Sequence, residues 1–103
     1  MPSSTNGKRP YRLVISQEIA KELGQFQYRA SWEGRGEQFL QALRSIIDGL
    51  VHRPRELGEP LYQLNALRLQ VRHVAVRPIA IHFAVHKDRP LVFIKAVDLL
   101  SEK

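Results

Sequence analysis

Residues 68–98, RLQVRHVAVRPIAIHFAVHKDRPLVFIKAVD, decide the fold of this chain. Runs rich in valine, isoleucine and phenylalanine are separated by proline-containing breaks at residues 76–78 and 87–90, which predicts three consecutive antiparallel strands. From Ile79 to Val85 the odd-numbered side chains are large and apolar, whereas the even-numbered ones are alanine or histidine. Since successive side chains of a strand point to opposite faces, the stretch predicts a sheet with one buried face and one polar face.

The same parity predicts how the strands pair. If the odd-numbered residues of 67–71 also belong to the buried face, a three-residue loop of residues 76–78 must join the first two strands, since a two-residue loop would place Gln70 and Arg72 inside. His73 then has the parity of a core or rim residue. This register pairs Ala75 with Ile79, Val71 with Phe83 and Leu69 with Val85. A four-residue loop, residues 87–90, would in turn pair Val92 with Val85, Ile94 with Phe83 and Ala96 with Ile81.

The first half of the chain predicts a strand and two helices. A β-prone run, residues 11–15, precedes Ser16, which can cap a helix by accepting hydrogen bonds from the first-turn backbone. Apolar side chains then recur at helical spacing in two stretches separated by the glycines around Arg35. The stripes are Ile19, Leu23, Phe26 and Ala30, and then Phe39, Leu43, Ile46, Ile47 and Leu50. We therefore expect an α+β fold, with an N-terminal strand and a helical hairpin packed on one face of a small twisted antiparallel sheet.

Length and composition bound the possibilities further. With 103 residues, of which 44% are hydrophobic, the chain is predicted to form one domain over residues 10–103, preceded by a flexible polar arm, residues 1–9. It has no cysteine and no apolar run long enough for a membrane span or a signal peptide, which makes the cytoplasm the expected location. The net charge of +6 and the pI near 10.2 favour an anionic partner such as a nucleic acid or an acidic protein segment.

The predicted polar face carries the candidate functional residues. The register sets Arg68 opposite His86, and His82 between Arg72 and Lys95, with Phe93 beside Ala84. His82 and His86 could act as acid and base in a metal-free cleavage of RNA, because histidine titrates near neutral pH. Guanidinium and ammonium groups could hold the phosphate and Phe93 could contact a base. The same residues could instead form an anion-binding face without chemistry, or a solvated face of ordinary charges. The predicted binding residues are Arg68, Arg72, Lys95 and Phe93.

The sequence predicts no metal or other cofactor. His82 and His86 are four residues apart, about 13 Å on a strand, which is too far to share one ion. Trp32 lies beside the glycine turn between the two helices, where we expect it to cap the core rather than to stack on a base.

Several motifs resemble the RelE/ParE superfamily, the small toxins of type II toxin–antitoxin (plasmid stabilisation) modules. The resemblance covers about residues 10 to 100. Residues 12–23, RLVISQEIAKEL, are similar to the first strand of that family passing into a helix with an alanine in its first turn. A helical hairpin, a proline-containing loop and a three-strand meander follow, with residues 81–85, IHFAV, standing where the family has an aromatic-plus-valine strand.

The resemblance implies a cytoplasmic toxin neutralised by a cognate antitoxin protein. One branch of the family cleaves messenger RNA in the ribosomal A site without a metal, and the other blocks DNA gyrase. In the cleaving branch an arginine lies three residues before the strand aromatic, and basic or tyrosine groups follow the last strand. The matching positions here are Ala80, and Leu99 and Leu100. Cleavage therefore stays an open question, and the alternative is a non-catalytic, small basic domain that binds nucleic acid or protein. The target and the oligomeric state are also left open.

Overall fold

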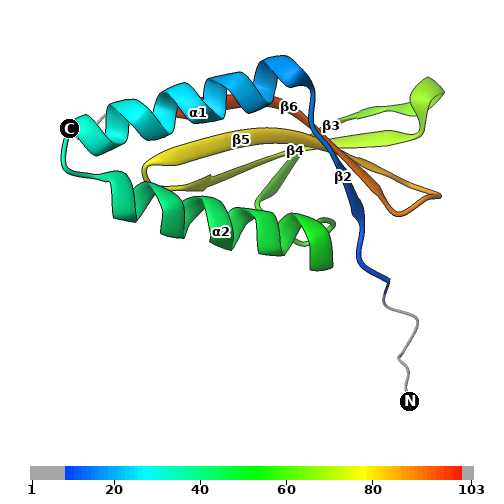
Figure 1. Ribbon diagram of the computed structural model, residues 1–103. Helices are drawn as coiled ribbons and strands as arrows, with labels where there is room; N and C mark the ends of the chain where they lie inside the picture. The colour runs from blue at the N-terminus through cyan, green and yellow to red at the C-terminus, as the bar shows by residue number, and fades with distance from the viewer. Residues whose placement is uncertain (1–8, 101–103) are drawn as a thin grey trace.

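The structure, a computed structural model, describes residues 9–100. The predicted arm, residues 1–9, lies outside the described residues except for Arg9. The elements follow one another as strand, two helices and four strands (Figure 1). They are β2 (Arg12–Val14), α1 (Gln17–Trp32), α2 (Gly36–His52), β3 (Glu59–Leu64), a 3₁₀ turn η1 (Asn65–Leu67), β4 (Leu69–Val76), β5 (Ile79–His86) and β6 (Leu91–Leu99).

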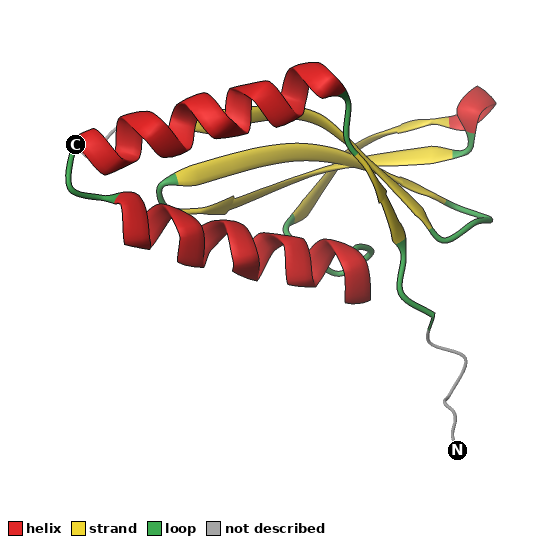
Figure 2. Ribbon diagram, viewed as in Figure 1, coloured by secondary structure: helices red, strands yellow, loops and turns green. Residues whose placement is uncertain are grey.

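The strands form one sheet in the order β2-β6-β5-β4-β3. The last four strands make an antiparallel meander, while β2 runs parallel to β6, with Arg12 opposite Leu91 and Val14 opposite Phe93. The sheet is therefore mixed rather than purely antiparallel. In Figure 2 both helices lie along the sheet: α1 packs against β6, and α2 packs against β2, β4 and β5. Both share one core with the sheet, so the helices form one layer and the sheet forms the second.

The two helices form where the apolar stripes predict them. The Ser16 side chain accepts a hydrogen bond from the backbone N–H of Ile19 at 3.1 Å, which confirms it as the N-cap of α1. The stripe residues of both helices are buried or half-buried, and Phe39, Ile46 and Leu50 are fully enclosed against the sheet. On the sheet side, the odd-numbered residues from Ile79 to Val85 fill the same core. The prediction of an α+β fold with a helical hairpin on one face of a sheet is confirmed.

The predicted register of the first hairpin is wrong by one residue. The loop between β4 and β5 consists of two residues, Arg77 and Pro78, and it pairs Val76 with Ile79 and Val74 with Ile81. The even-numbered residues of β4 therefore face the helices. The prediction rejected this register because it buries Arg72, which is indeed 6% exposed and lies opposite Phe83. The structure makes that burial tolerable by giving the guanidinium three acceptors within the protein.

The second hairpin follows the prediction up to a bulge. The loop of residues 87–90 is confirmed, as are the pairs of Val85 with Val92 and of Phe83 with Ile94. Beyond this point the register shifts, so that Val97, not Ala96, lies opposite Ile81, and His82 pairs with Ala96 instead of Lys95. Lys95 is the extra residue of a β-bulge, a feature that bends the strand and redirects a side chain.

Two further predictions differ from the structure, and one strand was not predicted. Trp32 does not cap the core: it is 76% exposed at the end of α1, in edge-to-face contact with Tyr28. Leu67 lies in the 3₁₀ turn and is exposed, not on the buried face of a strand. Residues 59–64 form β3, a separate edge strand of the meander that the sequence reading did not resolve. Neither helix within residues 9–100 has both the length and the apolar character that crossing a bilayer requires.

Candidate functional site

The face of the sheet turned away from the helices carries a group of polar and aromatic side chains. We call it the open face and define it by His73, His82, Tyr62, Phe93 and Lys95. The register assigns these positions: His73 pairs with His82, and one row further along the strands Tyr62, Val71, Ala84 and Phe93 lie side by side on four neighbouring strands. The rigid strands thus hold imidazole, phenol, phenyl and ammonium groups on one surface.

Two histidines contact each other on the open face. The ring centroids of His73 and His82 are 4.8 Å apart, and the rings are tilted by 47°. Both side chains are half-buried, so each remains accessible to a ligand. His73 was predicted to have core parity, and the shift of register moves it to the open face instead. Two neighbouring imidazoles can supply a proton acceptor and a proton donor at the same place.

Lys95 and Tyr62 meet across the open face. The Lys95 ammonium donates a hydrogen bond to the Tyr62 hydroxyl at 3.4 Å and lies 5.8 Å from the centre of the ring. Tyr62 is 50% exposed, and Lys95 is exposed as well. The bulge that displaces Lys95 from the predicted pairing with His82 thus brings a cation to an aromatic ring. In such a pair the ammonium can bind the phosphate of a nucleotide and the aromatic ring can stack on its base.

Small apolar side chains lie between the polar and aromatic groups of the open face. Val71 and Ala84 are buried although they point away from the helices, and neither belongs to the core cluster. Phe93, half-buried, lies beside Ala84 as predicted. The open face is therefore a shallow aromatic and apolar surface with polar groups above it, not a uniformly charged one.

Arg72 does not belong to this surface. Its Nε donates to the Leu57 carbonyl oxygen at 2.9 Å, one terminal nitrogen donates to the Gly58 carbonyl oxygen at 3.2 Å, and the other donates to the Gln70 side chain at 3.0 Å. The guanidinium thereby fastens the loop after α2 to the sheet. Arg72 is buried on the helix side, so the prediction that it lies on the open face beside His82 is wrong.

Arg68 is held in an ion pair. It lies between η1 and β4 in the left-handed conformation, with φ +58°, and donates two hydrogen bonds to Asp88, at 2.8 and 2.9 Å. The Arg68 hydrogen bond lowers the pKa of the Asp88 carboxyl, and the same bond raises the pKa of Arg68. Leu69, not Arg68, lies opposite His86, so the predicted pairing of these two basic residues is wrong.

His86 is committed to the β5–β6 turn. Its Nδ1 accepts hydrogen bonds from the backbone N–H groups of Asp88 and Arg89, at 3.0 and 3.1 Å. The two predicted catalytic histidines therefore have different surroundings, since His82 contacts His73 while His86 closes a turn. Across residues 9–100, no three carboxylate or imidazole side chains are gathered as a metal ion would require.

No family model matches the sequence, and no curated protein or solved structure matches it either. The structure also shows the surroundings of Ala80, Leu99 and Leu100, the positions at which the resemblance implies arginine, other basic or tyrosine side chains. Ala80 is buried opposite Asp98 and Ala75, Leu99 packs against the core, and the Leu100 carbonyl oxygen accepts a hydrogen bond from Arg35.

The sequence reading missed two residues of the open face. His73 was assigned to the core side because the register was wrong by one residue. Tyr62 was not among the predicted binding residues, and its partner, Lys95, is displaced by a bulge. An aromatic residue among the exposed positions of an edge strand was the available signal for Tyr62.

Proposed function

We propose that this chain is a RelE/ParE-like toxin component of a type II toxin–antitoxin module, acting in the cytoplasm on RNA during translation. Two observations support the proposal. The element order, a strand, a helical hairpin and an antiparallel meander, agrees with what the resemblance implies. The contact of His73 with His82 supports the proposed RNA cleavage, because it brings together two groups that can act as acid and base. They lie on the open face with the Lys95 ammonium and the rings of Tyr62 and Phe93. In this proposal a cognate antitoxin covers the open face when the toxin is inactive.

The proposed reaction is metal-free cleavage by the neighbouring ribose hydroxyl. One histidine, neutral, removes the proton of the 2′-hydroxyl, whose oxygen attacks the adjacent phosphorus. The bond from phosphorus to the 5′-oxygen breaks, and the other histidine, protonated, gives its proton to that leaving oxygen. The products are a 2′,3′-cyclic phosphate and a 5′-hydroxyl end. Lys95 would offset the negative charge that develops at phosphorus, and Tyr62 would stack on a base.

The first prediction concerns growth. Expression of this chain in bacteria without a partner is expected to arrest growth and protein synthesis, whereas a variant with both His73 and His82 replaced by alanine is expected to permit growth. Colony counts and amino-acid incorporation measure the effect. Normal growth with abundant folded wild-type protein would refute the toxin activity.

The second prediction concerns cleavage. Replacing His82 or His73 with alanine should slow the cleavage of RNA on ribosomes by about 10²- to 10⁴-fold, the usual contribution of an acid or a base. Replacing Gln41, an exposed polar residue of α2, with alanine provides the control and should leave the rate unchanged. The measurement is the rate of product formation, with the terminal groups of the product identified. Equal rates in all three variants and the wild type would remove the histidine pair from the mechanism.

The second candidate function is a non-catalytic module that binds nucleic acid or protein. It is favoured by the surroundings of the predicted cations, since Arg72 is buried, Arg68 is paired and Ala80 provides no charge. If this candidate is correct, RNA binds to the open face with an affinity that falls as salt rises, but no strand is cut. The cleavage assay above separates the two functions.

A further inference from the structure

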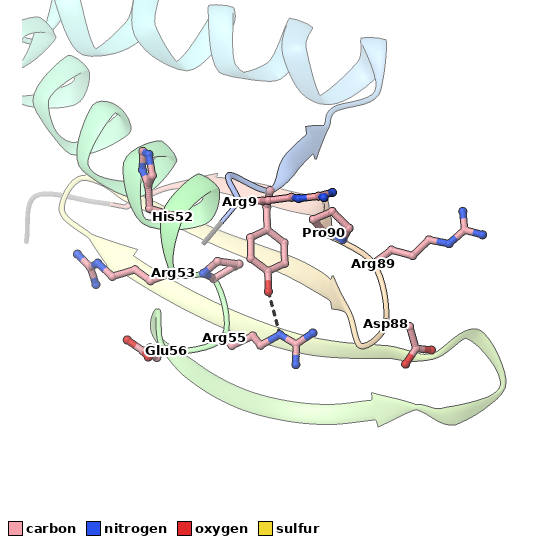
Figure 3. A pocket seen from close by; sticks show the side chains of 10 residues that line it. Arg9, His52, Arg53, Arg55, Glu56, Asp88, Arg89 and Pro90 are labelled. Carbon is pink, nitrogen blue, oxygen red and sulfur yellow. Dashed lines mark hydrogen bonds between the residues drawn. The ribbon is translucent and has the colours of Figure 1, made fainter. Parts of the chain in front are cut away.

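A cavity of about 660 Å³ lies below the end of α2, away from the residues of the open face. Three parts of the chain form it: the residues before β2, the loop after α2 and the β5–β6 turn (Figure 3). We call it the arginine cavity, because four of its ten lining residues are arginines. The lining consists of Arg9, Tyr11, His52, Arg53, Pro54, Arg55, Glu56, Asp88, Arg89 and Pro90.

Arg55 is fixed in place within the arginine cavity. Its Nε donates to the Tyr11 hydroxyl at 3.0 Å, the bond drawn in Figure 3, and one terminal nitrogen donates to the carbonyl oxygens of His86 and Lys87 at 3.2 and 2.7 Å. Tyr11 is held in turn, because its backbone N–H donates to the Val51 carbonyl oxygen at 2.7 Å. A guanidinium has five N–H donors, so these bonds leave the two N–H groups of the other terminal nitrogen for a ligand.

The charges of the cavity are not balanced by the protein. Arg9, Arg53 and Arg89 make no side-chain hydrogen bond or ion pair with other residues of the described range, 9–100. Of the two carboxylates in the lining, Asp88 already receives two hydrogen bonds from Arg68. Figure 3 shows Arg9 and Arg89 on the Pro90 side of the cavity, and Arg53 and Glu56 on the other side. The Pro90 side therefore gathers cations without an unpaired carboxylate, and a bound anion would relieve their mutual repulsion.

We propose that the arginine cavity binds the phosphate group of a nucleotide, either free or at the 5′ end of an RNA strand. Guanidinium groups match phosphate because their paired N–H donors fit two phosphate oxygens at once. The cavity has the volume of a small-molecule site, and the ring of Tyr11 with Pro90 provides apolar walls for a ribose or a base. The inference does not rest on the proposed function, since it uses none of the residues of the open face.

Calorimetric titration of the full chain at low salt tests this site. The probes are inorganic phosphate, ADP, and a single-stranded RNA hexamer with or without a 5′-phosphate. The double variant Arg9→Gln with Arg89→Gln is expected to bind the preferred phosphate probe at least tenfold more weakly. The matched control, Arg29→Gln with Arg44→Gln, removes two exposed arginines of α1 and α2 and should keep the affinity within about twofold.

Each outcome decides the proposal. Tighter binding of ADP than of the hexamers supports a free nucleotide, and tighter binding of the phosphorylated hexamer than of the unphosphorylated one supports an RNA end. The proposal is overturned if no probe binds, if both double variants lose affinity equally, or if the 5′-phosphate changes nothing and ADP does not bind. The residues replaced in this titration lie outside the open face, so the failure of one site does not count against the other.

Discussion

Replacing Gly58 with alanine is expected to destabilise the protein by at least about 3 kcal/mol, because both the backbone conformation and the space require glycine. Gly58 has φ +67°, in the left-handed region that a side chain disfavours. An added Cβ would lie 2.0 Å from the His73 carbonyl oxygen and 3.0 Å from the Val74 Cα. These are backbone atoms of β4, so no change of rotamer can relieve the clash, and the start of β3 must separate from its partner.

A second glycine provides the control for this substitution. Gly34, in the turn between α1 and α2, has φ +76°, but an added Cβ there meets no atom within 4 Å. Gly34→Ala should therefore carry only the cost of the left-handed conformation, roughly 1–2 kcal/mol. Urea denaturation followed by circular dichroism measures both changes. If the two variants lose the same stability, the close approach of Gly58 to β4 is not what requires glycine there.

Replacing Arg72 with alanine is expected to cost about 3 kcal/mol of stability. The substitution removes three hydrogen bonds and leaves the carbonyl groups of Leu57 and Gly58 without these donors beside the sheet. Lysine at this position keeps the charge but cannot reach three acceptors in a planar fork, so Arg72→Lys should recover only part of the loss.

The matched control is Arg44→Ala, which removes an exposed arginine from α2 and should change stability by less than about 0.5 kcal/mol. The midpoint of urea denaturation distinguishes the variants. If Arg72→Ala folds with wild-type stability yet loses affinity for RNA, the residue acts at a surface after all. If Arg72→Ala loses stability while its folded fraction keeps the affinity for RNA, the role of Arg72 is to hold the loop after α2 against the sheet.

Helices were predictable here because their signal is local. The stripes from Ile19 to Ala30 and from Phe39 to Leu50 repeat at 3.6-residue spacing, and Ser16 stands where the first helix begins. The turn at residues 87–90 was predictable for the same reason, since four consecutive loop-forming residues separate two apolar runs. With these elements in place, few arrangements other than a helical layer on a sheet can bury the stripes.

The register of β4 was not predictable from parity. Val71 is odd-numbered while Val74 and Val76 are even-numbered, so the strand has apolar side chains on both faces and the pattern is ambiguous. The prediction chose the register that keeps Arg72 in water. The opposite register is stable because the carbonyl oxygens of residues 57 and 58 accept hydrogen bonds from Arg72. No sequence pattern predicts that a loop will place two carbonyl oxygens there.

The same limit applies to the sites. His73 comes close to His82 only in the observed register, and Lys95 reaches Tyr62 only through a bulge. The arginine cavity draws its residues from positions 9–11, 52–56 and 88–90. The basic character of the loop after α2 was visible in the sequence, but its proximity to the β5–β6 turn depends on how α2 crosses the sheet.

The parallel pairing of β2 with β6 has a consequence for the synthesis of the protein. Arg12 and Leu91 are partners, so β2 cannot pair until about 80 further residues have been translated. At roughly 5–20 residues per second, this interval lasts several seconds. During that time the two helices have no complete sheet to cover, and their apolar stripes stay exposed. The nascent chain therefore completes its five-stranded sheet, and gains any activity that depends on it, only when β6 has left the ribosome.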